Sequence, residues 1–291
     1  MSIRTLPGAP TGRPSADVRA HFSPLALQRW DSGVRAASDD ADRSISVYDV
    51  IGYDYWTGEG VTAKRIAGAL RSLGKGPVTV NINSPGGDLF EGLAIYNLLR
   101  EHDGEVTVRI LGLAASAASV VAMAGDTVQI GRAAFLMVHN AWVMAIGNRH
   151  DLRDVAEQME PFDAAMADIY AARTGGDAES MAKLMDAETW IGGSAAVEQG
   201  FADELLASDQ IGEDGEKAKA SAVRRLESAL RASMPKNEAM RLISDFKTSL
   251  RAGGAPRDAG TTGGDDAAAL STTAALAASL TTIMKENSYV S

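Results

Sequence analysis

Strand and helix patterns alternate along residues 45–206, and this alternation limits the folds open to the chain more than any other feature. Strand patterns at 45–52, 78–83 and 106–111 are each followed by apolar residues at helical spacing. Such an order is typical of βαβ units, whose parallel strands are joined by right-handed helical crossovers. We therefore predict an α/β domain with a mostly parallel, helix-covered sheet over residues 45–208.

The boundaries of the other elements follow from periodicity and turn residues. We expect helices at 61–73, 89–100, 114–124, 152–173 and 194–199, and short strands at 127–130 and 135–138. Thr62 and Ser194 are the expected N-caps of the first and last of these helices, because a hydroxyl can accept a hydrogen bond from an unpaired helical amide.

The two flanking regions differ in character from the central domain. Residues 1–44 contain scattered prolines and an acidic run without a sustained period, which predicts an N-terminal arm or a loosely docked lead-in. Residues 209–291 contain charged, Ala-rich helical stretches, a Gly/Pro linker and a low-complexity Ala/Ser/Thr/Leu tract. We predict a helical or low-complexity tail there, with a domain boundary near residue 208.

Composition excludes several classes of function. The 291 residues include no cysteine, so disulfides, thiolate nucleophiles and Cys-ligated zinc are excluded. With 38 acidic and 28 basic residues, the net charge of −10 argues against a nucleic-acid-binding surface. The sequence has no phosphate-binding P-loop motif, and it shows neither a signal-peptide pattern nor a convincing membrane span. We expect a cytosolic protein with no cofactor and no metal.

Polar residues at the ends of predicted elements are candidates for nucleophilic catalysis. Ser116 lies among Gly and Ala residues where a strand gives way to a helix, and helix N-terminal amides can stabilise an oxyanion. His139 ends the apolar run 135–138 and has the chemistry of a general base. Asp186 or Glu188 could accept the imidazole N–H. Each residue alone fits a structural role better, but their order along the chain favours convergence on one site.

The turn Ser84-Pro85-Gly86-Gly87 directly follows a predicted strand. Two glycines permit positive φ and can expose backbone amides to a bound ligand. An ordinary β-to-α turn would have the same sequence, so the turn alone identifies no site.

Taken together, these segments resemble the Clp-type serine peptidase family, and in particular the ClpP-like head maturation proteases of phage and prophage gene clusters. The resemblance spans about residues 45–206. It is carried by Asn83-Ser84-Pro85-Gly86-Gly87 with Gly92, Ile95 and Tyr96, by Gly112-Leu113-Ala114-Ala115-Ser116, by Met137-Val138-His139, and by the stretch 190–203.

The resemblance implies a ClpP/crotonase-like β/α spiral and a serine endopeptidase without a cofactor. Ser116 would be the nucleophile, His139 the base, and the amides of Gly87 and Ala117 the oxyanion hole. Counting back from Gly200, the catalytic Asp of the family falls on Glu188.

Three departures from the family pattern accompany this assignment. Glu188 is one methylene longer than Asp and must retract to hold the same imidazole, and Asp186 remains its rival. The interval from Ser116 to His139 is about two residues shorter than is usual in the family. The loop after His139 also lacks the proline that usually follows.

The resemblance further implies a homo-oligomeric ring, which the predicted helix at 152–173 would help to join, and protein or peptide substrates. The partners would be a separate ATP-dependent unfoldase or capsid and scaffold proteins. Two alternatives stay open: a crotonase-type acyl-CoA enzyme, which shares the fold but needs no Ser–His pair, and an inactive family member that serves as an assembly scaffold.

Overall fold

The computed structural model describes residues 6–10, 19–20, 23–36, 43–52, 60–207 and 211–213. Of the tail predicted over 209–291, only residues 211–213 belong to this set. Within the described residues, no helix is both long enough and apolar enough to cross a membrane.

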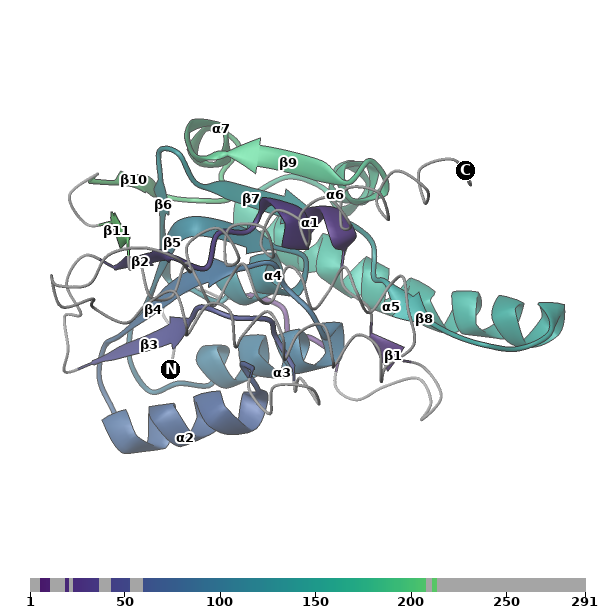
Figure 1. Cartoon of the computed structure of the whole chain (residues 1–291), viewed down its shortest axis with the longest axis horizontal. Helices are drawn as coiled ribbons and strands as arrows, with labels where there is room; N and C mark the ends of the chain where they lie inside the picture. Colours follow the sequence, from purple (N-terminus) through teal and green to yellow (C-terminus); the bar gives the residue numbers. More distant parts are fainter. Residues whose placement is uncertain are drawn as a thin grey trace, which may run out of the picture. The chain divides into compact units, whose positions relative to one another are not determined.

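A parallel sheet forms the centre of the fold (Figure 1). The strands follow the order β10–β6–β5–β4–β3, and each neighbouring pair is parallel. Their bounds are β3 Ser44–Val47, β4 Val78–Ser84, β5 Val106–Ala115, β6 Thr127–Gly131 and β10 Glu204–Leu206. The predicted α/β domain with a mostly parallel sheet is thus confirmed.

Two further strands extend the sheet from the end of β5. Strand β7 (Phe135–Val138) pairs in parallel with residues Leu113–Ala115 of β5. Strand β9 (Thr189–Gly192) pairs antiparallel with β7. The segments around positions 116, 139 and 188 therefore meet at one corner of the sheet.

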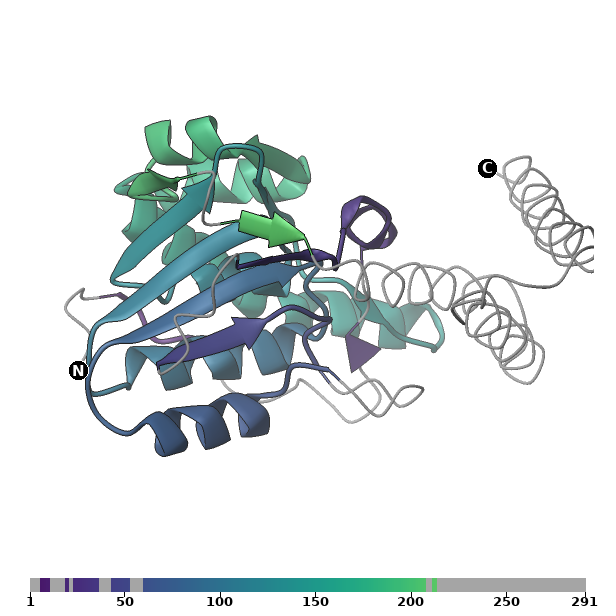
Figure 2. The ribbon, with the colours of Figure 1, turned by 60° about the vertical axis from the view of Figure 1, so that its left-hand side comes forward.

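One face of the sheet carries the main hydrophobic core. Val80, Val108 and Ile110 point to this face and are fully buried. Helices α2 (Ala63–Leu73), α3 (Leu89–Arg100) and α4 (Ala117–Ala122) contribute apolar residues to the same core. Figure 2 shows α2 and α3 side by side against this face. Each fully buried aliphatic side chain contributes about 1.5–3 kcal/mol to folding, so this interface holds the strand ends in place.

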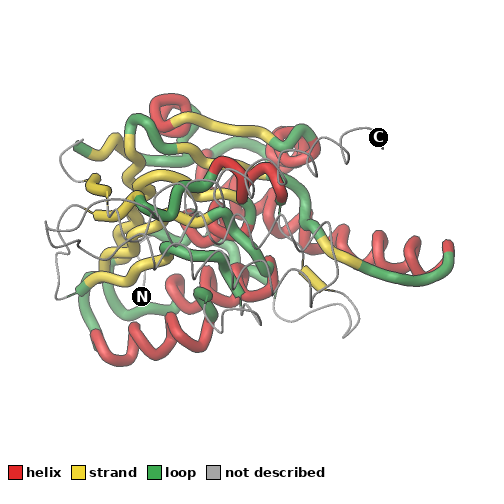
Figure 3. Tube along the Cα trace, in the orientation of Figure 1, coloured by secondary structure: helices red, strands yellow, loops and turns green. Residues whose placement is uncertain are grey.

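The second half of the domain is built on a long helix, α5 (Arg149–Thr174). It begins with a capping box between Asn148 and Asp151 and ends at Gly175, whose φ of 75° suits glycine. Helices α6 (Ala178–Asp186) and α7 (Gly193–Glu198) flank β9. Figure 3 shows α5 extending beyond the sheet together with the segment that contains β8 (Val143–Met144).

Several predicted boundaries were wrong. The helix predicted from residue 114 begins only at Ala117, because pairing with β7 keeps residues 113–115 extended despite their small side chains. The strand predicted over 45–52 ends at Val47. Ser194 is not an N-cap: the strand β9 runs directly into α7, and Gly192 occupies the cap position without a side-chain bond.

Part of the predicted N-terminal arm is firmly packed on the sheet. Helix α1 (Pro24–Arg29) and strand β2 (Val34–Ala36) bracket Trp30, which is 0% exposed. The indole Nε1 of Trp30 donates to the Asn83 carbonyl at 2.9 Å, and Asn83 Nδ2 donates to the Asp31 carbonyl at 2.6 Å. A loosely docked lead-in is therefore the wrong description of residues 23–36. Strand β1 (Arg19–Ala20) pairs with β8, and β11 (Ile211–Glu213) pairs with β2.

Candidate active site

Ser116 stands at a sharp turn between β5 and α4. Its φ of 54° and ψ of −128° are unusual for a residue with a side chain, and such strain costs about 1–3 kcal/mol. The backbone N–H of Ser116 donates to the Met137 carbonyl at 3.0 Å, which anchors the turn to β7. A strained serine between a strand and a helix is the local geometry of a nucleophile elbow.

The structure brings His139 to Ser116, as predicted. Ala115 and Met137 are paired in the β5–β7 register, so the residues just beyond each strand end leave the sheet at the same point. His139 Nε2 lies 2.7 Å from Ser116 Oγ, which is hydrogen-bond distance. The sheet register, and not a loop, therefore sets this contact.

Glu188 approaches the other side of the imidazole. Because Val138 pairs with Thr189 in the β7–β9 register, the residue before Thr189 lies next to His139. The Oε2 of Glu188 is 3.9 Å from His139 Nδ1, which is too long for a hydrogen bond. Within the described residues Nδ1 is buried and has no hydrogen-bond partner. The carboxylate is thus adjacent to the imidazole but not yet bonded to it.

Asp186, the rival carboxylate, is engaged elsewhere. Its Oδ1 accepts a hydrogen bond from Asn140 Nδ2 at 2.7 Å. Asp163 accepts from the amide of Ala141 at 2.7 Å, and burial raises the pKa of this carboxyl. Asp186 and Asp163 therefore hold the loop after His139, a role that the sequence did not indicate. Glu188 is the carboxylate next to His139 Nδ1.

Burial sets the protonation state of the histidine. It lowers the pKa of His139 from 6.5 to about 4, because the imidazolium would lose its hydration. The imidazole is therefore neutral near pH 7 and can accept a proton at Nε2. In that tautomer the N–H is on Nδ1, the nitrogen that faces Glu188.

The glycine turn lies against the Ser116 segment. Gly86 has a φ of 87°, and a Cβ atom placed on it would come within 2.7 Å of Ser116 Cβ. Gly86 accepts from the amide of Ile51 and Asp88 donates to the carbonyl of Ile51, which leaves the Gly87 N–H outside this pairing. Only glycine fits at this turn, because any side chain would push it away from the serine.

The second predicted oxyanion donor is the first residue of α4. The Ala117 N–H belongs to the opening turn of the helix, so it has no intrahelical acceptor four residues back. It directly follows Ser116 and shares a peptide unit with the Ser116 carbonyl. Both predicted amides, Gly87 and Ala117, therefore belong to segments that border Ser116.

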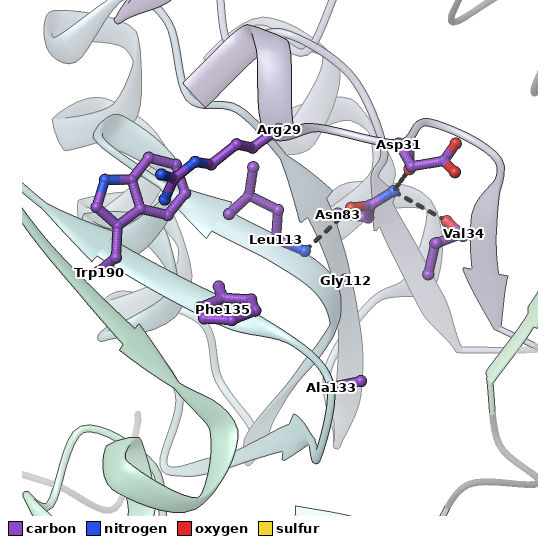
Figure 4. A pocket seen from close by; sticks show the side chains of 9 residues that line it. All are labelled: Arg29, Asp31, Val34, Asn83, Gly112, Leu113, Ala133, Phe135 and Trp190. Carbon is purple, nitrogen blue, oxygen red and sulfur yellow. Dashed lines mark hydrogen bonds between the residues drawn. The ribbon is translucent and has the colours of Figure 1, made fainter. Parts of the chain in front are cut away.

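A pocket of about 480 Å³ lies beside the strands β4, β5, β7 and β9 (Figure 4). Side chains from α1, β2, β4, β5, β7 and β9 line it, and the Arg29 guanidinium lies 4.3 Å from the centre of the Trp190 ring. Ser116, His139 and Glu188 are not among its lining residues. The pocket is therefore distinct from the Ser–His contact. Over the described residues, no group of three His, Asp or Glu side chains is placed to hold a metal ion.

Comparison with known proteins gives consistent matches. The family model described as Clp protease matches residues 61–209. The ATP-dependent Clp protease proteolytic subunit 1 of Chlamydia muridarum is 30% identical over 165 residues, covering 52% of this chain and 84% of that protein. Subunit 2 of Thermobifida fusca is 31% identical over 152 residues, covering 50% and 74%.

Two other matches have a different extent. Subunit 1 of Salinibacter ruber is 28% identical over 134 residues, covering 45% of this chain and 57% of that subunit, so the chain spans just over half of its length. Among solved structures, a mutant ClpP1 from Listeria monocytogenes matches with a TM-score of 0.47 and 20% identity, covering 61% of this chain and 95% of that one.

Proposed function

The chain belongs to the Clp protease family, and from this premise we propose that it is a serine endopeptidase with Ser116 as its nucleophile. Its α/β fold with a parallel sheet is the ClpP-like fold implied by the resemblance. The observation that carries the proposal is the 2.7 Å contact between His139 Nε2 and Ser116 Oγ. A crotonase-type acyl-CoA enzyme needs no such pair, so the contact favours peptide hydrolysis.

The proposed reaction begins with proton transfer from Ser116 Oγ to His139 Nε2. The freed oxygen attacks the scissile carbonyl carbon, and the amides of Gly87 and Ala117 hydrogen-bond the resulting oxyanion. The imidazolium then gives its proton to the leaving amine, which departs and leaves an acyl-enzyme. A water molecule, deprotonated by His139, attacks the ester and releases the acid, and Ser116 recovers its proton.

Glu188 would stabilise the imidazolium that forms during both steps. Its carboxylate must move about 1 Å closer to Nδ1 to reach the 2.7–2.9 Å of a charge-assisted hydrogen bond. Catalytic hydrogen bonds are often long without substrate and shorten in the reacting complex. We therefore propose Glu188, rather than Asp186, as the third member of the triad.

The test uses a fluorophosphonate probe, which phosphorylates an activated serine. We expect the wild-type chain to be labelled and Ser116→Ala to be unlabelled. Ser194→Ala is the matched control, because it removes the hydroxyl of an exposed serine at the start of α7. Equal labelling of wild type and Ser116→Ala would refute Ser116 as the nucleophile, whereas failure of the wild type to react would refute the peptidase proposal and favour an inactive scaffold.

We also propose that the chain assembles as a homo-oligomer through the segment 142–152. Large apolar side chains are exposed there: Trp142, Met144, Leu152 and, at 96% exposure, Ile146. Soluble proteins usually cover such a group of apolar side chains at an interface. Light scattering should show an assembly for the wild type and smaller particles for Ile146→Asp. A wild-type monomer at micromolar concentration would contradict this proposal.

As substrates we propose capsid or scaffold polypeptides, in keeping with the resemblance to head maturation proteases. The sequence has no P-loop, so any ATP-driven unfolding must come from another chain. Whether the chain needs such an unfolding partner can be tested with an unfolded protein such as casein. Cleavage of casein by the isolated chain supports a peptidase independent of an unfoldase, whereas cleavage only with an added ATPase supports the alternative partner.

A further inference from the structure

The carbonyl of Ser116 is held from one side by α4. Ser119 donates to this oxygen twice, from its backbone N–H at 2.9 Å and from its hydroxyl at 2.6 Å. The Val120 N–H adds a longer contact at 3.4 Å. The backbone bonds are those of any first helical turn, but the short hydroxyl bond is an addition that only the side chain at position 119 supplies.

Tyr170 extends this contact into a chain of hydrogen bonds. Its hydroxyl lies 2.7 Å from Ser119 Oγ. Because the single hydroxyl proton of Ser119 goes to the Ser116 carbonyl, the Tyr170 hydroxyl must be the donor between the two side chains. Tyr170 is 1% exposed, and burial raises the pKa of its hydroxyl, so the proton stays on this oxygen.

This series of hydrogen bonds ends at the peptide unit that carries a proposed oxyanion donor, the Ala117 N–H. The Ser116 carbonyl and the Ala117 N–H belong to one planar peptide group and point in opposite directions. Whatever fixes the carbonyl oxygen also fixes the direction of the Ala117 N–H. A donor on the carbonyl further polarises the group and makes its N–H a stronger donor, as in other cooperative hydrogen-bond chains.

We propose that Ser119 and Tyr170 are positioning residues, which aim and polarise the Ala117 amide toward the oxyanion. This inference rests on the proposed peptidase function. Ser116 has a strained φ of 54°, so its peptide units need outside support to keep one orientation. The hydroxyls of Ser119 and Tyr170 supply that support from α4 and α5, on the side of the peptide opposite to the substrate.

The experiment compares single hydroxyl deletions. Tyr170→Phe and Ser119→Ala each remove one hydroxyl from this series of hydrogen bonds. Tyr96→Phe is the matched control, because Tyr96 is fully buried on α3 and its hydroxyl donates instead to the Pro7 carbonyl at 2.8 Å. The maximal rate of fluorophosphonate labelling and the half-saturating probe concentration are measured separately, at a temperature where circular dichroism shows every variant folded.

We expect Tyr170→Phe and Ser119→Ala to lower the maximal rate about tenfold and to leave the half-saturating concentration unchanged. Complete removal of an oxyanion donor costs about 100- to 1,000-fold, and a weakened, less well aimed donor costs less. Tyr96→Phe should stay within about twofold of wild type, whatever its loss of stability. The double variant should be no slower than Ser119→Ala, because Tyr170 acts through Ser119.

Each contrary result has one meaning. Wild-type maximal rates in both Tyr170→Phe and Ser119→Ala would overturn the inference, as would an equal loss in Tyr96→Phe or additive losses in the double variant. If Tyr170→Phe does not fold, Ser119→Ala carries the test with the same control. Labelling that persists in Ser116→Ala would refute Ser116 as the nucleophile of the proposed function, which is a separate outcome.

Discussion

Replacement of Glu188 by glutamine tests the electrostatic part of the triad. The glutamine has nearly the same shape but no charge, and the carboxylate it replaces lies 3.9 Å from His139 Nδ1. At that separation and an effective dielectric constant of about 20, the charge stabilises an imidazolium by about 4 kcal/mol. The side chain of Glu188 is 28% exposed, so screening reduces this to about 2–3 kcal/mol.

This energy applies to the transition state and not to the free protein. The imidazole of His139 is neutral before reaction and is not hydrogen-bonded to the carboxylate, so Glu188→Gln should leave the free energy of unfolding within about 0.5 kcal/mol of wild type. The maximal rate of fluorophosphonate labelling at pH 7.5 should fall about 30- to 150-fold, since each 1.36 kcal/mol is a factor of ten.

Asp186→Asn is the matched control for the charge. Asp186 stands two residues away and accepts a hydrogen bond from Asn140, so its replacement should change the labelling rate less than about threefold. A Glu188→Gln variant that reacts as fast as wild type, with Asp186→Asn strongly impaired, would show that the carboxylate next to Nδ1 is not the one that stabilises the imidazolium.

Three further predictions address the base, the glycine turn and the packed N-terminal segment. Burial lowers the pKa of His139 to about 4, so below about pH 6.5 the unfolded chain binds a proton more readily than the folded chain, and the free energy of unfolding falls as the pH drops from about 6.5 to 4. Urea unfolding at pH 5 and pH 7.5 should show this loss of stability, and His139→Gln should make the loss smaller. Gly86→Ala should abolish labelling by pushing the turn off Ser116, whereas Gly74→Ala, which also has positive φ but meets no atom within 4 Å, should label normally. Trp30→Ala should cost about 3–5 kcal/mol in urea unfolding, because it empties a fully buried site; a loss below 1 kcal/mol would mean that α1 is not part of the cooperative fold.

The sequence predicted the elements whose pattern is local. Strand β4 alternates apolar and polar residues, and helix α3 was predicted with its observed bounds, because both patterns can be recognised within one short stretch of sequence. The contact between Ser116 and His139 was also predicted, because each residue lies at the end of a predicted element and their order matches the family resemblance.

Features that depend on distant partners were beyond sequence reasoning. The burial of Trp30 relies on the Asn83 carbonyl, 53 positions along the chain, and α1 is only 6 residues long, too short for a periodic signal. Counting back from Gly200 pointed to Glu188, but Asp186 has the same carboxylate chemistry and lies only two positions away, so it remained a rival. They are separated by the register of β9 and by the turn before it, where Glu188 adopts a φ of 45°.

The pairing of β5 with β7 has a consequence for how this chain tolerates change in length. Ser116 and His139 each follow a strand end, and the register of Ala115 with Met137 fixes how far apart those ends are. The connection between the two strands has an exposed turn at 132–133, where a change in length need not alter this register, and the shorter interval found here is compatible with the contact between nucleophile and base. Insertions in the exposed turn at 132–133 should therefore be tolerated, whereas changes within α4, which carries Ala117 and Ser119, should not.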